Sequence, residues 1–201
     1  MANIFTNLLA KGAKEGYFPA RTQQARDWFR ERAEDVIVRN QIAVVRSNPV
    51  LTTRTQTGFL YLFAYSPKTE TLPYHDKYPV VFPFQRAKGG FYGINMHYLP
   101  LEYRALLMDR LYDLTMDENY DIDTRLRITY SILESSRKFR FFKPCVRRYL
   151  NNHVVTRFAL IPANQWDIAL FLPLERFVKS NGGSYPTQKV HIDTTKKIRR
   201  G

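Results

Sequence analysis

The chain has 201 residues, of which 44% are hydrophobic and 14% aromatic, and these proportions favour a folded protein over intrinsic disorder. It carries 31 Lys and Arg against 18 Asp and Glu, a formal net charge of +13. Such an excess indicates contact with a polyanion or with acidic protein surfaces. The single cysteine, Cys145, excludes an internal disulfide and a Cys-rich zinc site, so we expect synthesis in a reducing cytoplasm. No apolar run reaches the roughly 20 residues that cross a bilayer, and we expect neither a secretory signal nor a membrane contact.

The N-terminal part of the chain begins weakly and then becomes regular. Residues 4–10 could form one or two helical turns, but Gly12 and Gly16 bracket a weak segment after them, so we interpret residues 1–20 as an arm that orders only against a partner. Thr22 is a good helix N-cap, and the spacing of Trp28 and Phe29 with later apolar residues predicts an amphipathic helix that ends near Asn40. Residues 43–57 are polar and rich in β-formers, which predicts an exposed edge strand or an extended arm.

The stretch from Gly58 to Pro100 is the densest in aromatic and β-branched residues, and Pro, Gly, Asp and Lys interrupt it at short intervals. This composition predicts a small, twisted antiparallel sheet with tight reversals. We expect three strands, with a reversal at residues 87–89 between the last two. They are Phe59 to Tyr65, Tyr78 to Phe84 and Gly90 to His97.

Helices are expected after this sheet. Pro100 suits a first helical turn, and the apolar stripe of residues 101–114 predicts a helix, followed by another from Asp123 to Ser135. Acidic residues between 109 and 123 lack the glycine-centred loop of an EF-hand, so we interpret them as helix caps and loop residues and expect no metal site. Residues 154–161 predict a further strand, and residues 163–172 a short buried helix.

Together these patterns predict an α+β fold, in which a small antiparallel β-sheet from residues 43 to 97 packs against several helices between 101 and 172. The expected organisation is an N-terminal arm (1–20), a single α+β domain (21–178) and a basic C-terminal tail (179–201). Both ends are expected to be extended arms that seek partners.

The best candidate for nucleic-acid contact is the segment from Arg137 to Tyr149, which has six cations, four aromatics and no acid. Cations neutralise phosphates, and aromatic rings offer faces for unstacked bases. An alternative stays open, in which the aromatics are core residues and the cations simply point outward. The C-terminal tail adds a second cationic group, while Arg46 and Arg54 are secondary candidates. The candidate DNA-binding residues are Arg137, Lys138, Arg140, Lys143, Arg147, Arg148, Lys196, Lys197, Arg199 and Arg200.

Enzyme motifs are absent from the sequence. It has no dinucleotide-binding or phosphate-binding glycine loop, no HExxH and no GxSxG, and its histidines stand apart from one another and from Cys145. Two-metal phosphodiester chemistry needs converging carboxylates, and only Glu70 and Asp76 lie near the expected strands. We therefore expect no catalytic residues, no cofactor and no enzymatic activity.

Four strings carry a resemblance to a known family: FLYLFAYSPKTETLPYHDKYPVVFPF, GGFYGINMHYLPLEYRALLMDRLYDL, RFFKPCVRRYL and WDIALFLPLERF. Over residues 58–178 the chain resembles virion proteins of large contractile-tailed phages (myoviruses), often labelled DNA end protector proteins. The resemblance implies a virion protein, made in the host cytoplasm, that binds the ends of packaged double-stranded DNA or lies at the portal vertex. It implies protection of those ends from host exonucleases, and it transfers no catalytic residue.

Two functions remain open from the sequence. One is DNA-end binding at the portal or neck vertex by sequence-independent neutralisation of phosphates. The other is a structural subunit of the neck, tail or baseplate that contacts only other virion proteins. In either case we expect the protein to be oligomeric in the particle. Cations clustered on one face favour the first function, and scattered cations with long extended termini favour the second.

Overall fold

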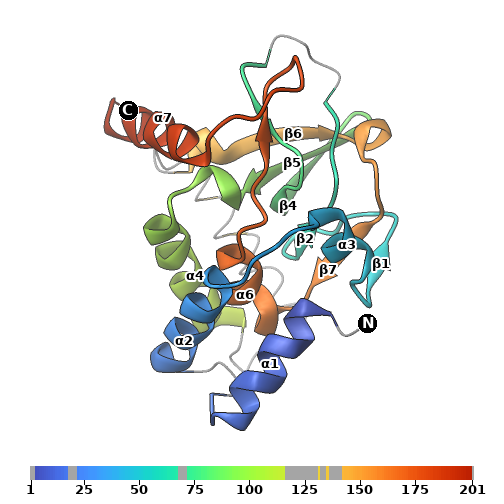
Figure 1. The fold of residues 1–201 in the computed structure, drawn as a ribbon. Coiled ribbons are helices and arrows are strands. Elements are labelled where there is room, and N and C mark those ends of the chain that lie inside the picture. The colour runs from blue at the N-terminus through green and yellow to red at the C-terminus, as the bar shows by residue number, and fades with distance from the viewer. Residues whose placement is uncertain are drawn as a thin grey trace.

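The structure is a computed structural model that describes residues 3–17, 22–67, 72–115, 131, 135 and 142–200. It confirms the α+β class: a six-stranded antiparallel sheet of order β1-β7-β2-β4-β5-β6 packs against helices, and a two-stranded sheet pairs β3 with β8 (Figure 1). The strands are β1 (Leu51–Thr52), β2 (Leu60–Leu62), β3 (His75–Asp76), β4 (Val80–Ala87), β5 (Gly90–Asn95), β6 (Val146–Leu150), β7 (Phe158–Ile161) and β8 (Phe177–Val178). The α-helices are α1 (Ile4–Lys14), α2 (Gln23–Glu34), α3 (Gln41–Arg46), α4 (Leu101–Thr115), α6 (Trp166–Phe171) and α7 (Thr187–Arg200). Short 3-10 helices are η1 (Met96–Tyr98), η2 (Lys143–Cys145), η3 (Asn151–His153) and η4 (Ala163–Gln165).

The three expected strands correspond to β2, β4 and β5, and the expected reversal is the tight Lys88-Gly89 turn. Gly89 has a φ of 72°, which glycine adopts without the steric cost that a side chain would add. Pro83 interrupts β4, where the pairing with β5 shifts register between Pro83 and Gln85. A bulge accommodates proline in a sheet because the ladder locally lacks the hydrogen bond that proline cannot donate.

Within the domain, α3 and β6 differ from the sequence-based expectation. Residues 41–46 form helix α3, and the Asn40 side chain caps it by accepting a hydrogen bond from the Ala43 backbone N–H at 3.2 Å. This cap offsets the β-propensity of Val44 and Val45. The second difference is β6, which adds the segment 146–150 to the sheet as the partner of β5. The sheet therefore extends well beyond residues 43–97 in sequence.

The two faces of the large sheet are packed differently. One face contributes aliphatic residues such as Leu60, Val80 and Ile94 to the main core, together with side chains of α1, α2, α4 and α6. The other face carries an aromatic cluster that includes Phe63, Phe91 and Tyr149. Backbone hydrogen bonds from Ser66 to His153 and from Val155 to Ala64 carry the chain between β6 and β7 across the end of β2. Side chains on both faces are buried, which explains why the strands are nearly continuous in hydrophobic residues.

Both termini are helices where extended arms were expected. Asn3 caps α1 through a 2.9 Å hydrogen bond from the Phe5 backbone N–H, and α1 buries Phe5 and Leu8 in the main core. Helix α7 buries Val190, Thr194 and Ile198, which recur every four residues along one face. Amphipathic spacing thus lets each end dock on the chain itself, so neither helix depends on a partner for its buried face.

The predicted helices after residues 22 and 100 are confirmed as α2 and α4, although α2 ends at Glu34 and not near Asn40. Thr22 caps α2 by accepting a 3.1 Å hydrogen bond from the Ala25 N–H. The buried Arg30 joins three helices, because it donates to Asp109 of α4 and to Asp167 of α6, each at 2.7 Å. Asp109 is thus an ion-pair partner within the fold. The expected helix from Asp123 to Ser135 lies almost wholly outside the described residues.

Candidate nucleic-acid interface

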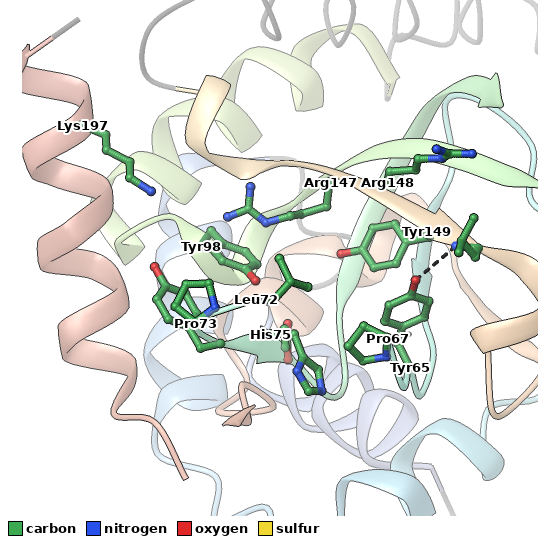
Figure 2. A pocket seen from close by; sticks show the side chains of 13 residues that line it. Tyr65, Pro67, Leu72, Pro73, His75, Tyr98, Arg147, Arg148, Tyr149 and Lys197 are labelled. Atoms are coloured by element: carbon green, nitrogen blue, oxygen red, sulfur yellow. Dashed lines mark hydrogen bonds between the residues drawn. The ribbon is translucent and has the colours of Figure 1, made fainter. Parts of the chain in front are cut away.

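A cavity of about 510 Å³ lies between the edge strand β6 and helix α7. Figure 2 shows its wall, in which α7 contributes Lys197, β6 contributes Arg147 and Arg148, and η1 contributes Tyr98. The lining residues are Tyr65, Pro67, Leu72, Pro73, Tyr74, His75, Asp76, Tyr98, Arg147, Arg148, Tyr149, Leu150 and Lys197. Two cationic segments about 50 residues apart in the sequence therefore meet at one concave site.

Arg147 is the most constrained of the cations. Its guanidinium carbon lies 3.9 Å from the centre of the Tyr98 ring, and its Nη1 donates a 2.9 Å hydrogen bond to the Val146 carbonyl. A cation held over an aromatic face is stabilised by the negative charge density of the ring. Burial raises the pKa of Tyr98, so its phenol stays neutral at physiological pH. The ring therefore orients Arg147 without neutralising its charge.

Tyr98 is itself fixed from below by the fully buried Arg104 of α4. Arg104 Nε donates to the Leu99 carbonyl at 2.9 Å, and its Nη2 donates to the His97 carbonyl at 3.3 Å. These two carbonyls flank Tyr98 in the chain. Arg104 Nη1 also pairs with Glu175 at 2.5 Å, which compensates the buried positive charge. The buried Arg104 guanidinium thus holds the backbone on both sides of Tyr98, the residue that η1 contributes to the cavity wall.

The carboxylate in the cavity wall, Asp76, is already engaged. Its Oδ2 lies 2.7 Å from His97 Nδ1 and accepts a 3.1 Å hydrogen bond from Asn95, while its Oδ1 accepts from the Tyr78 N–H at 3.1 Å. Asn95 also donates to the Tyr149 hydroxyl at 3.0 Å. This buried network ties β3, β5 and β6 together behind the cavity. Asp76 is 3% exposed, so among the described lining residues the cations are the charged groups that reach the opening.

The aromatic rings of the site pack against one another. Tyr74 is stacked between Tyr98 and Tyr185, with ring centres 6.1 and 4.5 Å away. Tyr149 is buried among Phe63, Tyr65 and Phe91. Of the two interpretations of the aromatics in residues 137–149, the core interpretation therefore holds for Tyr149. The partly buried Phe142 also packs against the main core, while Phe139 and Phe141 lie outside the described residues.

The predicted cations fall into three groups. Arg147, Arg148 and Lys197 line the cavity, and no carboxylate in the described ranges forms an ion pair with any of them. Lys143 in η2 and Lys196, Arg199 and Arg200 in α7 are exposed nearby in sequence but do not line it. Arg137, Lys138 and Arg140 lie outside the described residues. The secondary candidates Arg46 and Arg54 are exposed, and neither lines the cavity.

Sequence reasoning missed the residues that shape the site. Tyr74, His75 and Tyr98 were not among the predicted binding residues, and Asp76 was considered only as a carboxylate for metal chemistry. Their roles depend on contacts with β6 and α7, so no local pattern marks them. The one usable signal was the string His97-Tyr98-Leu99-Pro100, an aromatic immediately before a helix start, which is too common to identify a site.

Comparison with known proteins places the chain. Residues 1–194 match the family model described as the phage T4 terminal DNA protecting protein. The chain belongs to this family. Neither the curated proteins nor the solved structures that were compared contain a match. The match extends beyond residues 58–178, where the resemblance was noted, and includes α1, α2 and most of α7.

Membership confirms the expectation of a phage structural protein that protects DNA ends, and such a protein is a component of the virion. The family description concerns protection of DNA and names no catalytic reaction. Within the ranges that the structure describes, no group of three or more His, Cys, Asp or Glu side chains is placed to hold a metal ion. None of the described helices is long and apolar enough to cross a membrane.

Proposed function

We propose that this protein binds the ends of linear double-stranded phage DNA through the cavity between β6 and α7, and shields those ends without catalysis. The observation that carries the proposal is the meeting of Arg147, Arg148 and Lys197 at one concave site in a member of a DNA-end protecting family. Lys and Arg side chains bind the phosphate backbone regardless of sequence, as a protector of packaged ends requires.

The rest of the charge suits a molecule surrounded by polyanions. Exposed cations occur on α1, on the α2–α3 link, on β4 and along α7, for example Lys14, Arg39, Arg86 and Lys189. A distributed positive surface accelerates encounter with DNA and contributes non-specific affinity. We assign the cavity the role of retaining the end once the molecule has reached DNA.

We further propose that the protein sits at the portal or neck vertex and contacts other virion proteins there. Ile37, Leu106 and Val155 are large hydrophobic residues with exposed fractions of 80%, 62% and 61%. Single exposed hydrophobic residues are ordinary on a monomer, so these three support the proposal only as candidate contact points. A neck, tail or baseplate subunit without DNA contact would use the same residues and leave the cavity cations dispensable.

The test compares DNA binding and nuclease protection by two double variants of equal charge. The Arg147→Ala, Arg148→Ala variant removes two cavity cations, while the control Arg39→Ala, Arg157→Ala removes two exposed cations outside the cavity. We expect the cavity variant to bind linear duplex about tenfold or more weakly, because hydrogen bonds to charged groups are the strong ones. Its log–log salt slope should fall by about two, since each phosphate contact contributes roughly one.

Protection is measured as the survival of linear duplex exposed to a double-strand exonuclease. Wild type and the control variant should slow digestion, and the cavity variant should not. Because Arg147 packs on Tyr98, the Arg148→Ala, Lys197→Ala variant repeats the measurement with two exposed side chains whose removal spares the core. Equal affinity, equal salt slope and equal protection in all variants would contradict DNA-end binding through the cavity and favour a structural subunit of the neck, tail or baseplate.

A further inference from the structure

The cavity has the size of a pocket for a small ligand. At about 510 Å³ it can admit a phosphate together with part of its nucleotide, but it is too small to enclose a duplex. Only a group that protrudes from the nucleic acid can enter. On linear DNA, such a group exists at the end of a strand, where the backbone stops.

The charges inside the cavity favour a doubly charged group. A phosphomonoester carries about −1.5 to −2 charges near neutral pH, because its second pKa is about 6, whereas an internal phosphodiester carries a single charge. Figure 2 shows the charged ends of Lys197 and Arg147 on the Tyr98 side of the cavity, with Arg148 turned away from them. Like charges that face a shared space repel each other, and an anion between them relieves that repulsion.

The arrangement of the aromatic rings argues for recognition of phosphate over recognition of a base. Tyr74 already stacks on Tyr98 and on Tyr185, one face of Tyr98 is covered by Arg147, and Tyr149 is buried. A base would have to displace one of these contacts to stack. The guanidinium, in contrast, is held flat by Tyr98 and the Val146 carbonyl, and a planar fork fixed in advance suits two phosphate oxygens at once.

We propose that this cavity holds the terminal phosphomonoester of a DNA strand, with Arg147 and Lys197 as its direct ligands and Arg148 at the rim. This inference deepens the proposed function and rests on it. It explains how a protein that does not read sequence tells an end from the interior of a duplex, since the extra charge and the free access occur together only at a terminus. Asp76, the one acidic residue among the described residues of the wall, is held by three hydrogen-bond partners behind the site and does not compete for the two cations.

The test uses the full-length protein and a DNA hairpin with one open blunt end, prepared with a 5′-phosphate, a 3′-phosphate or hydroxyls at both positions. Affinity is measured by fluorescence anisotropy at fixed salt, with the label in the loop. We expect one of the phosphorylated ends to bind about tenfold or more tightly than the hydroxyl end. A closed dumbbell of the same sequence measures binding to the interior of the duplex.

Three variants give the result its meaning. Lys197→Ala should lose most of the phosphate preference, whereas Lys189→Ala, an exposed lysine of the same helix outside the cavity, should keep it. Arg147→Lys keeps the charge and loses the planar fork, so it should keep part of the preference. Equal affinity of wild type for phosphate and hydroxyl ends would overturn this inference while leaving end binding intact. Equal affinity for the open hairpin and the dumbbell would instead contradict the proposed function.

Discussion

Replacing Arg104 with Met tests directly whether this buried residue holds the backbone around Tyr98 in the cavity wall. The guanidinium is fully buried, bonds the carbonyls of His97, Leu99 and Leu170, and pairs with Glu175 at 2.5 Å. Met keeps the length and bulk but removes every donor. Because loss of one partner leaves the other buried and uncompensated, we expect the free energy of unfolding to fall by about 3–5 kcal/mol.

The measurement is urea unfolding followed by circular dichroism, with the free energy extrapolated to zero denaturant. The control is Leu106→Ala in the same helix, whose side chain is 62% exposed and should change stability by no more than about 0.5 kcal/mol. Adding Glu175→Gln to Arg104→Met removes the stranded charge, so the double variant should lose less than the sum of the two single losses. A loss below about 1 kcal/mol for Arg104→Met would refute the argument that this residue holds the backbone around Tyr98.

Three further predictions concern other parts of the molecule. A Cβ added by Gly90→Ala would overlap the Tyr149 carbonyl oxygen of the adjacent strand, so we expect the free energy of unfolding to fall by about 2 kcal/mol or more in the same assay, and DNA binding to weaken because β6 is displaced. The control Gly16→Ser, at an open position with positive φ, tests backbone strain without the clash. Burial lowers the pKa of His75 and, together with Arg104, that of His191, so the unfolded chain binds protons more readily than the folded one. The free energy of unfolding should therefore fall as the pH is lowered from about 7 to about 5.5, and the His75→Gln, His191→Gln variant should show a smaller fall. An unchanged pH profile in that variant would contradict the role given to these two histidines. Burial raises the pKa of the Cys145 thiol to about 12, so a thiol reagent should modify it only at the rate at which the protein unfolds. Rapid modification of the native protein would show that this part of the core is accessible to solvent.

The sequence by itself determined the elements whose signals are local. The aromatic, β-branched stretch with its Lys88-Gly89 reversal predicted β2, β4 and β5, and the apolar stripes predicted α2 and α4. Hydrophobic periodicity and turn-forming residues are properties of neighbouring positions in the chain, so these elements can be predicted without knowledge of the fold. The same holds for the two cationic segments, which composition alone identified, and for the family, which the quoted strings indicated over part of the chain.

Only the tertiary structure decided which of these residues act together. Pairing of Arg147 with Gly93 and of Tyr149 with Phe91 places these two side chains on one face of β6 and Arg148 on the other, and a shift of one residue would exchange the faces. The docking of α7 through Val190, Thr194 and Ile198 then carries Lys197 to the same opening. These outcomes depend on contacts between residues far apart in the chain, where the burial of large side chains outweighs local preference.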